Sequence, residues 1–289
     1  KVKVSVELHP AVSRSIERTL HYGRRYYKVC PEFFTIKVPL TPEGYLAVRT
    51  LRQEKIPINF TLGFSVRQNY LAARLANPDF VNVFLGRLNQ VVMDHKAGSG
   101  DLVGEKVTLA TQQALISARE NHEEVESRLI AASIRSGDQV AFLAGLDVLT
   151  IPPKAMVAFQ ESETDQLASH IDDPIEPGID SDHNLAQRFP ELWELSDDFK
   201  NFVELLVSNP DIDSMQGAEL ERFSNEQGTK LFHPFSKTDL QKIQDHGKIP
   251  DLNAWPESVA LDDLMTQSAL QSFTKDQNAL DDRIRSFLK

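Results

Sequence analysis

The chain has 289 residues and a formal net charge of −11, from 31 basic and 42 acidic side chains. This acidic balance argues against nucleic acid as a partner. No apolar run approaches the roughly 20 residues that span a bilayer, so the sequence predicts no membrane segment. The single cysteine, Cys30, excludes an internal disulfide and indicates a reducing, cytoplasmic compartment.

The charge is unevenly distributed along the chain. Residues 1–154 carry 20 basic and 15 acidic side chains, whereas residues 155–289 carry 11 basic and 27 acidic ones. A mildly basic first half suits a small phosphorylated substrate. The two parts also differ in their pattern of expected elements.

Strand and helix patterns alternate six times in residues 1–154. The first strand alternates apolar and polar side chains strictly, and an amphipathic helix is expected at 12–28. Further helices begin at N-cap or capping-box patterns at Thr41, Ser65 and Ser136. The expected strands are residues 2–8, 33–39, 58–62, 80–85, 128–134 and 146–151, and a loop at 96–104 precedes a helix at 105–121.

The predicted strand 33–39 is a short apolar run that carries one lysine, Lys37, near its carboxyl end. Its length and its β-branched and aromatic content are typical of a fully buried strand. Because a buried ammonium is costly, a lysine there favours the neutral amine, which attacks carbonyls and forms Schiff bases. The alternative is a strand-end lysine that extends into water.

Polar side chains recur on the strand face that we expect to point inward, while apolar ones such as Val2 and Val4 pack outward under helices. Each polar residue has a structural alternative: an internal salt bridge, polar filling of a barrel layer, or a surface ion pair. Together they suggest a lysine nucleophile, a carboxylate for proton transfer, groups that orient hydroxyls and a two-arginine phosphate clamp. The inward set is Glu7, Lys37, Asn59, Thr61, Asn82, Phe84 and Ser133, with Ala131 on the same face and Arg87 and Arg135 at strand ends.

The alternation predicts an α/β fold with a parallel sheet, and polar residues at carboxyl ends of strands are typical of a TIM (β/α)8 barrel. The chain supplies about six of the eight units, the third to the eighth, so we expect two units to precede Lys1 in the complete protein. Helices are also expected at about 196–208, 215–226, 237–245 and 259–288, with a loop at 172–184. The predicted domains are a catalytic barrel at 1–160, a linker and helical insertion at 161–255, and a C-terminal helix packing on the barrel at 256–289.

Six motifs in the first part, in this order and spacing, resemble the transaldolase family of class I, Schiff-base-forming aldolases. They are VSVELHP at 4–10, FTIKVPLTPEG at 34–44, NFTLGFSVRQ at 59–68, VNVFLGRL at 81–88, AASIR at 131–135 and LTIPPK at 149–154. Residues 264–288 look like the closing helix of that family. The resemblance covers about residues 1–160 and 255–289, and it implies an amino-truncated (β/α) barrel.

The resemblance implies a role for each reacting residue. Lys37 matches the Schiff-base lysine, and Glu7 matches the acid that works with a water held at Thr61. Asn59 matches an asparagine that binds substrate and intermediate. Phe84 matches the transaldolase phenylalanine, where related fructose-6-phosphate aldolases carry a tyrosine.

The phosphate-binding arginines of the family match Arg87 and Arg135, with Ser133 beside the second. Two features depart from the family pattern. Asn82, which we also expect to bind substrate, stands where the family has a serine before the phenylalanine that Phe84 matches. The essential aspartate and its partner asparagine lie on the first two barrel strands, which this chain does not contain.

The implied function is transfer of a dihydroxyacetone unit between sugar phosphates in the pentose phosphate pathway. The expected substrates are fructose 6-phosphate, sedoheptulose 7-phosphate, erythrose 4-phosphate and glyceraldehyde 3-phosphate. No metal or organic cofactor is expected, because the iminium is the electron sink. The alternatives are a Schiff-base fructose-6-phosphate aldolase, which Phe84 disfavours, and a non-catalytic transaldolase-like binding protein. The sequence leaves open whether the protein forms a homodimer.

Overall fold

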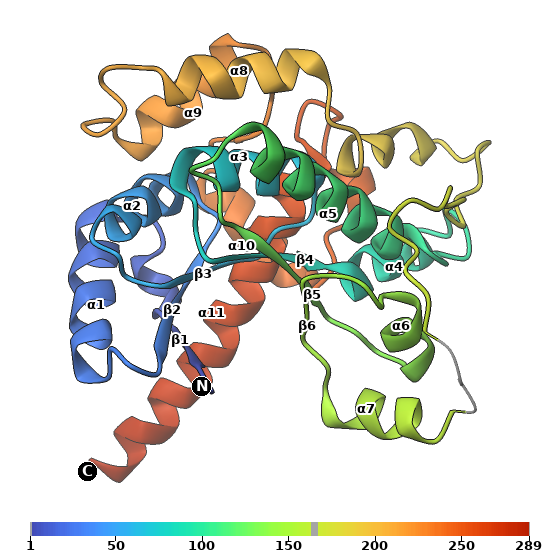
Figure 1. Ribbon diagram of the computed structural model, residues 1–289, viewed down its shortest axis with the longest axis horizontal. Helices are drawn as coiled ribbons and strands as arrows, with labels where there is room; N and C mark the ends of the chain where they lie inside the picture. The colour runs from blue at the N-terminus through green and yellow to red at the C-terminus, as the bar shows by residue number, and fades with distance from the viewer. Residues whose placement is uncertain (1, 163–166, 289) are drawn as a thin grey trace.

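The computed structural model describes residues 2–162 and 167–288. One parallel sheet, with six strands in sequence order, curves into half of a barrel (Figure 1). This arrangement confirms the predicted α/β fold and partial TIM barrel. The strands are β1 (Val4–Glu7), β2 (Phe34–Pro39), β3 (Ile58–Thr61), β4 (Phe80–Phe84), β5 (Arg128–Ala132) and β6 (Val148–Leu149). The two units expected to precede Lys1 stay a prediction.

Each strand is followed by helix, as predicted. The N-cap hydroxyls of Thr41, Ser65 and Ser136 accept backbone N–H bonds from the third helical residue, which fixes where three helices begin. The helices of this part are α1 (Ile16–Val29), α2 (Pro42–Gln53), α3 (Val66–Ala76), α4 (Leu85–Asp94), α5 (Val103–Asn121), α6 (Gly137–Phe142) and α7 (Pro153–Gln160).

Two elements differ from the sequence-based prediction. The helix expected from residue 12 begins at Ile16, after the 3-10 turn η1 (Pro10–Val12), because the Ser15 hydroxyl caps it by accepting the Arg18 N–H. The sequence-based prediction contains no helix between the fourth strand and the loop at 96–104, but α4 follows β4 directly, so Arg87 lies in the first turn of a helix.

The outward faces of the central strands form the core, as predicted. Ile36, Val38 and Phe60 are at most 1% exposed. In the first predicted strand the prediction is wrong for Val2 and Val4, which are 81% and 51% exposed, although Leu8 on the same predicted face is buried. The physical reason is the position of β1 at one end of the strand order, where it pairs only with β2 among the described residues.

The predicted inward position of Ala131 is also wrong. The register pairs Ala131 with Val83, whereas Ala132 pairs with Phe84. Paired residues of parallel strands point to the same face, so Ala131 faces outward into the core, where it is 0% exposed. Ser133 follows the end of β5, and its backbone is in the left-handed conformation, with φ of 67°. The direction of its side chain therefore does not follow from strand alternation.

The second part of the chain is helical, and its predicted helices are confirmed. Its α-helices are α8 (Asp197–Val207), α9 (Gly217–Glu226), α10 (Lys237–His246) and α11 (Leu261–Phe287), and its 3-10 turns are η2 (Ala186–Arg188), η3 (Pro190–Leu192) and η4 (Leu252–Ala254). The predicted loop at 172–184 contains no helix or strand. The domain limits stay a prediction, and their end points Lys1 and Lys289 lie outside the described residues.

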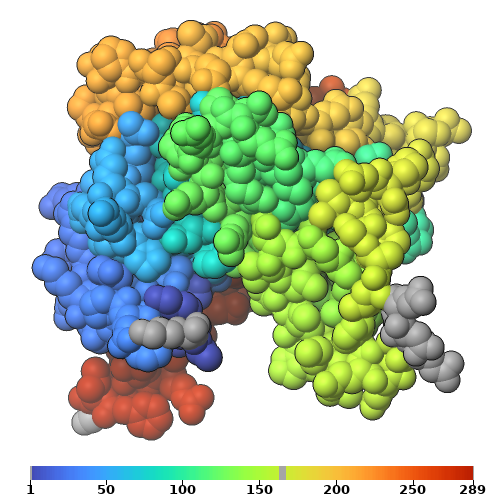
Figure 2. Space-filling model, viewed as in Figure 1, coloured from blue at the N-terminus to red at the C-terminus, as the bar shows by residue number. Residues whose placement is uncertain are grey.

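α8 and α9 pack on α3 and α2, outside the barrel helices, and form the upper rim in Figures 1 and 2. α11 instead crosses the carboxyl ends of the strands. The Thr266 hydroxyl donates to the Leu62 carbonyl just after β3 at 2.9 Å, and Asp281 lies 3.1 Å from His9 after β1. α11 therefore covers the end of the barrel where the predicted site residues lie. Within the described residues, no helix is long and apolar enough to cross a membrane.

Candidate active site

The site is centred on a contact between neighbouring strands. Glu7 of β1 and Lys37 of β2 are register partners, and Lys37 is in turn the register partner of Asn59. Lys37 Nζ lies 3.1 Å from Glu7 Oε2, with side-chain exposures of 19% and 37%. The lysine is thus mostly enclosed, and Glu7, its one acidic partner in the part of the chain that the structure describes, reaches solvent. The structure brings together the predicted nucleophile and the predicted carboxylate.

A row of polar groups continues from this pair along the inner face. The Asn59 side chain donates to the Ser5 hydroxyl at 2.8 Å, and Asn82 donates to the Asn59 side-chain oxygen at 3.0 Å. Asn59 and Asn82 are buried, so these bonds fix how their amides are oriented. Thr61 is fully buried, and its hydroxyl has no hydrogen-bond partner among the described residues. Such a group has free capacity for a water or a ligand hydroxyl.

Two arginines lie together at the ends of β4 and β5. Gly86, in the first turn of α4, is in close contact with the segment after β5: a Cβ added to Gly86 would come within 2.3 Å of the Ser133 carbonyl oxygen and 2.7 Å of Arg135 Nε. Only glycine permits this approach, and it places Ser133 and Arg135 against the turn that carries Arg87. The three residues predicted to bind phosphate are therefore neighbours.

The electrostatics of Arg87 favour an anion. Burial lowers the pKa of the Arg87 guanidinium, and the positive charge of Arg135 lowers it further. The negative charge of Asp276 of α11 raises this pKa and so partly offsets both effects. Arg87 Nη1 is buried and has no hydrogen-bond partner among the described residues. Arg135 is exposed and donates to Gln90 at 2.8 Å. Two close cations with unused donor capacity are chemically suited to a phosphate.

Phe84 is the last residue of β4, and its ring is tilted against the ring of Phe64, three residues after β3, at 5.8 Å between centroids. Of the nine predicted site residues, Glu7, Thr61 and Phe84 end their strands, and Arg87, Ser133 and Arg135 follow strand ends. Lys37, Asn59 and Asn82 lie within their strands. Sequence reasoning missed Phe273 of α11, whose ring centroid lies 5.2 Å from Lys37 Nζ and 6.0 Å from Arg87 Cζ.

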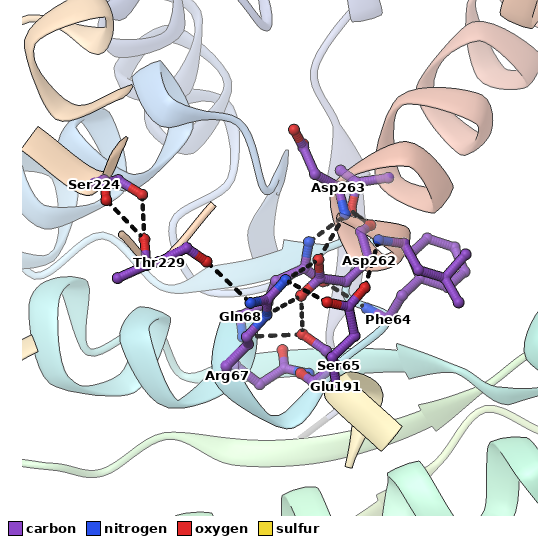
Figure 3. Close-up of polar contacts among 12 residues, drawn as sticks. Phe64, Ser65, Arg67, Gln68, Glu191, Ser224, Thr229, Asp262 and Asp263 are labelled. Atoms are coloured by element: carbon purple, nitrogen blue, oxygen red, sulfur yellow. Dashed lines mark hydrogen bonds and ion pairs between the residues drawn. The ribbon is translucent and has the colours of Figure 1, made fainter. Parts of the chain in front are cut away.

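Sequence reasoning also missed the anchor that positions α11 (Figure 3). Arg67 of α3 donates through Nε and Nη2 to the two carboxylate oxygens of Asp262, both at 2.7 Å, and the Ser65 hydroxyl donates to Asp262 at 2.6 Å. Asp262 is 0% exposed. Burial alone lowers the pKa of Arg67, but the charge and hydrogen bonds of Asp262 outweigh it and raise the pKa. Two acidic residues at the start of a helix are a common pattern, because they interact favourably with the helix dipole. The sequence does not show that Arg67 is the partner of Asp262.

Two further carboxyls surround this anchor. Burial raises the pKa of Asp263 to about 7, against the opposing effect of a hydrogen bond from the His233 N–H at 2.6 Å. Burial and the charge of Asp262 raise the pKa of Glu191, which accepts the Leu261 N–H at 2.7 Å. The start of α11 is therefore held by buried, pH-sensitive groups. No cluster of three or more potential metal ligands occurs among the described residues.

Residues 1–204 match the transaldolase/fructose-6-phosphate aldolase family, and the chain belongs to that family. It is 37% identical over 145 residues to a probable transaldolase of Phenylobacterium zucineum, an alignment that covers 50% of this chain and 59% of that protein. A probable transaldolase of Parvibaculum lavamentivorans is 35% identical over 136 residues, covering 46% and 56%. One of Exiguobacterium sibiricum is 36% identical over 153 residues, covering 52% and 62%. The chain thus spans less than two thirds of the length of these relatives.

Proposed function

We propose that the protein containing this chain is a transaldolase, which transfers a dihydroxyacetone unit between sugar phosphates through a lysine Schiff base. The observation that carries the proposal is the contact of Lys37 with Glu7 at the carboxyl ends of adjacent strands. Arg87 and Arg135 place two cations at neighbouring strand ends. Membership of the family and relatives named as transaldolases support the same class of reaction.

In the proposed reaction, Lys37 Nζ adds to the ketone carbon of the donor, and loss of water gives an iminium. The β-hydroxyl of the donor loses its proton to water as the bond between the α and β carbons breaks; the electron pair of that bond forms an enamine, and an aldose phosphate leaves. The enamine carbon then attacks the aldehyde of an acceptor aldose phosphate, whose oxygen takes up a proton, and hydrolysis returns the lysine amine. The iminium accepts the electron pair, so these steps require no metal or organic cofactor.

The residues around Lys37 have proposed roles in this sequence. Glu7 transfers protons to and from the nitrogen and oxygen during formation and hydrolysis of the iminium. The hydroxyl of Thr61, for which residues 2–162 and 167–288 supply no hydrogen-bond partner, holds the water that takes part in these transfers. Asn59 and Asn82, fixed by their mutual hydrogen bond, bind hydroxyls of the substrate and the intermediate.

The second group of residues sets which substrates bind. Arg87 and Arg135, with Ser133, bind the phosphate of donor and acceptor. Phe84 presents an aromatic wall without a hydroxyl, which favours transfer over simple aldol release. We place the reaction in the cytoplasmic pentose phosphate pathway, with residues 1–160 as the catalytic part and 256–289 as its covering helix.

The test is acceptor dependence in the complete protein. With fructose 6-phosphate and erythrose 4-phosphate, we expect sedoheptulose 7-phosphate and glyceraldehyde 3-phosphate in equal amounts. With fructose 6-phosphate alone, product formation should stop after about one turnover. Continuous release of free dihydroxyacetone would instead identify an aldolase, and no product in either assay would identify a non-catalytic binding protein.

A further inference from the structure

Phe273 connects the two halves of the candidate site. Its ring lies on α11, partly buried, with its centroid 5.2 Å from Lys37 Nζ and 6.0 Å from Arg87 Cζ. Both distances are within the range of a cation–π contact. The ring therefore borders the path between the reacting nitrogen and the phosphate-binding cation, which is the path that the carbon chain of a bound sugar phosphate would follow.

The position of this ring is fixed at both ends of the helix that carries it. Asp262 anchors the start of α11 through its buried pair with Arg67 (Figure 3), and Thr266 bonds the Leu62 carbonyl one turn later. Beyond the ring, Asp281 pairs with His9 at 3.1 Å. The anchors lie on two different strand ends, so Phe273 is held across the opening of the site.

An aromatic ring at this position affects one branch of the chemistry. The enamine on Lys37 has two fates: its carbon can attack an acceptor aldehyde, or it can take a proton to give the iminium. Water then adds to the iminium carbon, the carbon–nitrogen bond breaks, and the products are free dihydroxyacetone and the lysine amine. The ring lies 5.2 Å from Lys37 Nζ, so it limits the space from which water can reach the iminium carbon and slows hydrolysis on the release branch.

We infer that Phe273 is a specificity-determining residue, which keeps the three-carbon intermediate on Lys37 until an acceptor aldose phosphate takes it. This inference rests on the proposed transaldolase function and deepens it. It assigns the choice between transfer and release to a ring on the C-terminal helix as well as to Phe84 on the barrel. Removal of the ring should shift the intermediate toward release.

The measurement is a ratio, the rate of dihydroxyacetone release without acceptor divided by the rate of transfer with erythrose 4-phosphate. For Phe273→Ala we expect this ratio to rise about tenfold, equivalent to about 1.4 kcal/mol. Phe273→Tyr keeps the ring and should stay near the wild-type ratio. Phe287→Ala is the matched control, because Phe287 is the last residue of the same helix, about four turns beyond Phe273, and is 77% exposed.

A ratio separates this role from a structural one, because general damage lowers both rates together. Phe273→Leu keeps most of the apolar volume and provides a second variant if Phe273→Ala does not fold. An unchanged ratio in a folded variant that retains transfer would overturn the inference and leave the proposed function intact. Absence of both transfer and lysine adduct in the wild-type protein would overturn the proposed function itself, and the inference with it.

Discussion

The buried pair between Arg67 and Asp262 allows a quantitative prediction. Asp262→Asn keeps the size and one acceptor oxygen but removes the charge from a site that is 0% exposed. Loss of one partner of a buried ion pair typically costs about 3–5 kcal/mol, since the remaining charge is uncompensated. Glu191 lies 3.7 Å from Arg67 and would ionise more readily without Asp262, so we expect the lower end, about 3 kcal/mol.

The assay is thermal or urea unfolding, with Asp213→Asn as the matched control. Asp213 pairs with Arg49 at the same 2.7 Å, but its side chain is 65% exposed, so its loss should cost about 0.2–1 kcal/mol. For a chain of roughly this size, about 3 kcal/mol corresponds to a melting temperature lower by about 6–12 °C. Equal losses in the two variants would refute the conclusion that the buried pair anchors α11.

Three further predictions concern protons and phosphate. Because burial raises the pKa of Asp263 to about 7, above its unfolded value, its contribution to stability is complete at low pH and is lost as pH rises toward 7. The decrease in unfolding free energy between pH 5 and 8 should therefore be smaller in Asp263→Asn, by about 2–3 kcal/mol. Arg87→Ala should weaken phosphorylated acceptors by about 1.5–3 kcal/mol and unphosphorylated ones less, measured as kcat/KM. Glu7→Gln should keep the Lys37 adduct but slow its formation and hydrolysis by about 10²–10⁴-fold.

Each of these has a contradicting result. An identical pH profile for Asp263→Asn and wild type would mean that other groups carry the dependence. Equal losses of Arg87→Ala on both acceptor types would make the arginine structural. Adduct formation by Glu7→Gln within about twofold of wild type would remove Glu7 from proton transfer.

The barrel and the central pair were predictable from sequence because both depend on short-range rules. Strand alternation places Glu7, Lys37 and Asn59 on one face, and parallel strands bring their carboxyl ends to one edge. The same rule fails at Ser133, where a left-handed residue interrupts the alternation just after β5. A local backbone conformation of this kind is selected by the tertiary contact with Gly86, which no pattern within the strand reports.

The features that could not be predicted from the sequence depend on contacts between segments that lie far apart in the chain. The periodicity of residues 259–288 predicts a helix with an apolar face, but it does not say which surface that face contacts. Arg67 and Asp262 meet across 195 positions of sequence. From the sequence alone, Phe273 is expected to be one more apolar core residue. Only the fold shows that it lies beside Lys37.

Trapping of the covalent adduct shows which lysine forms the Schiff base. The complete protein is incubated with fructose 6-phosphate and borohydride, digested, and analysed by mass spectrometry. We expect a three-carbon reduced adduct on Lys37, and no adduct in Lys37→Arg, which keeps the fold but stays protonated. An adduct on a different lysine, or one that persists in Lys37→Arg, would contradict the proposal that Lys37 is the nucleophile.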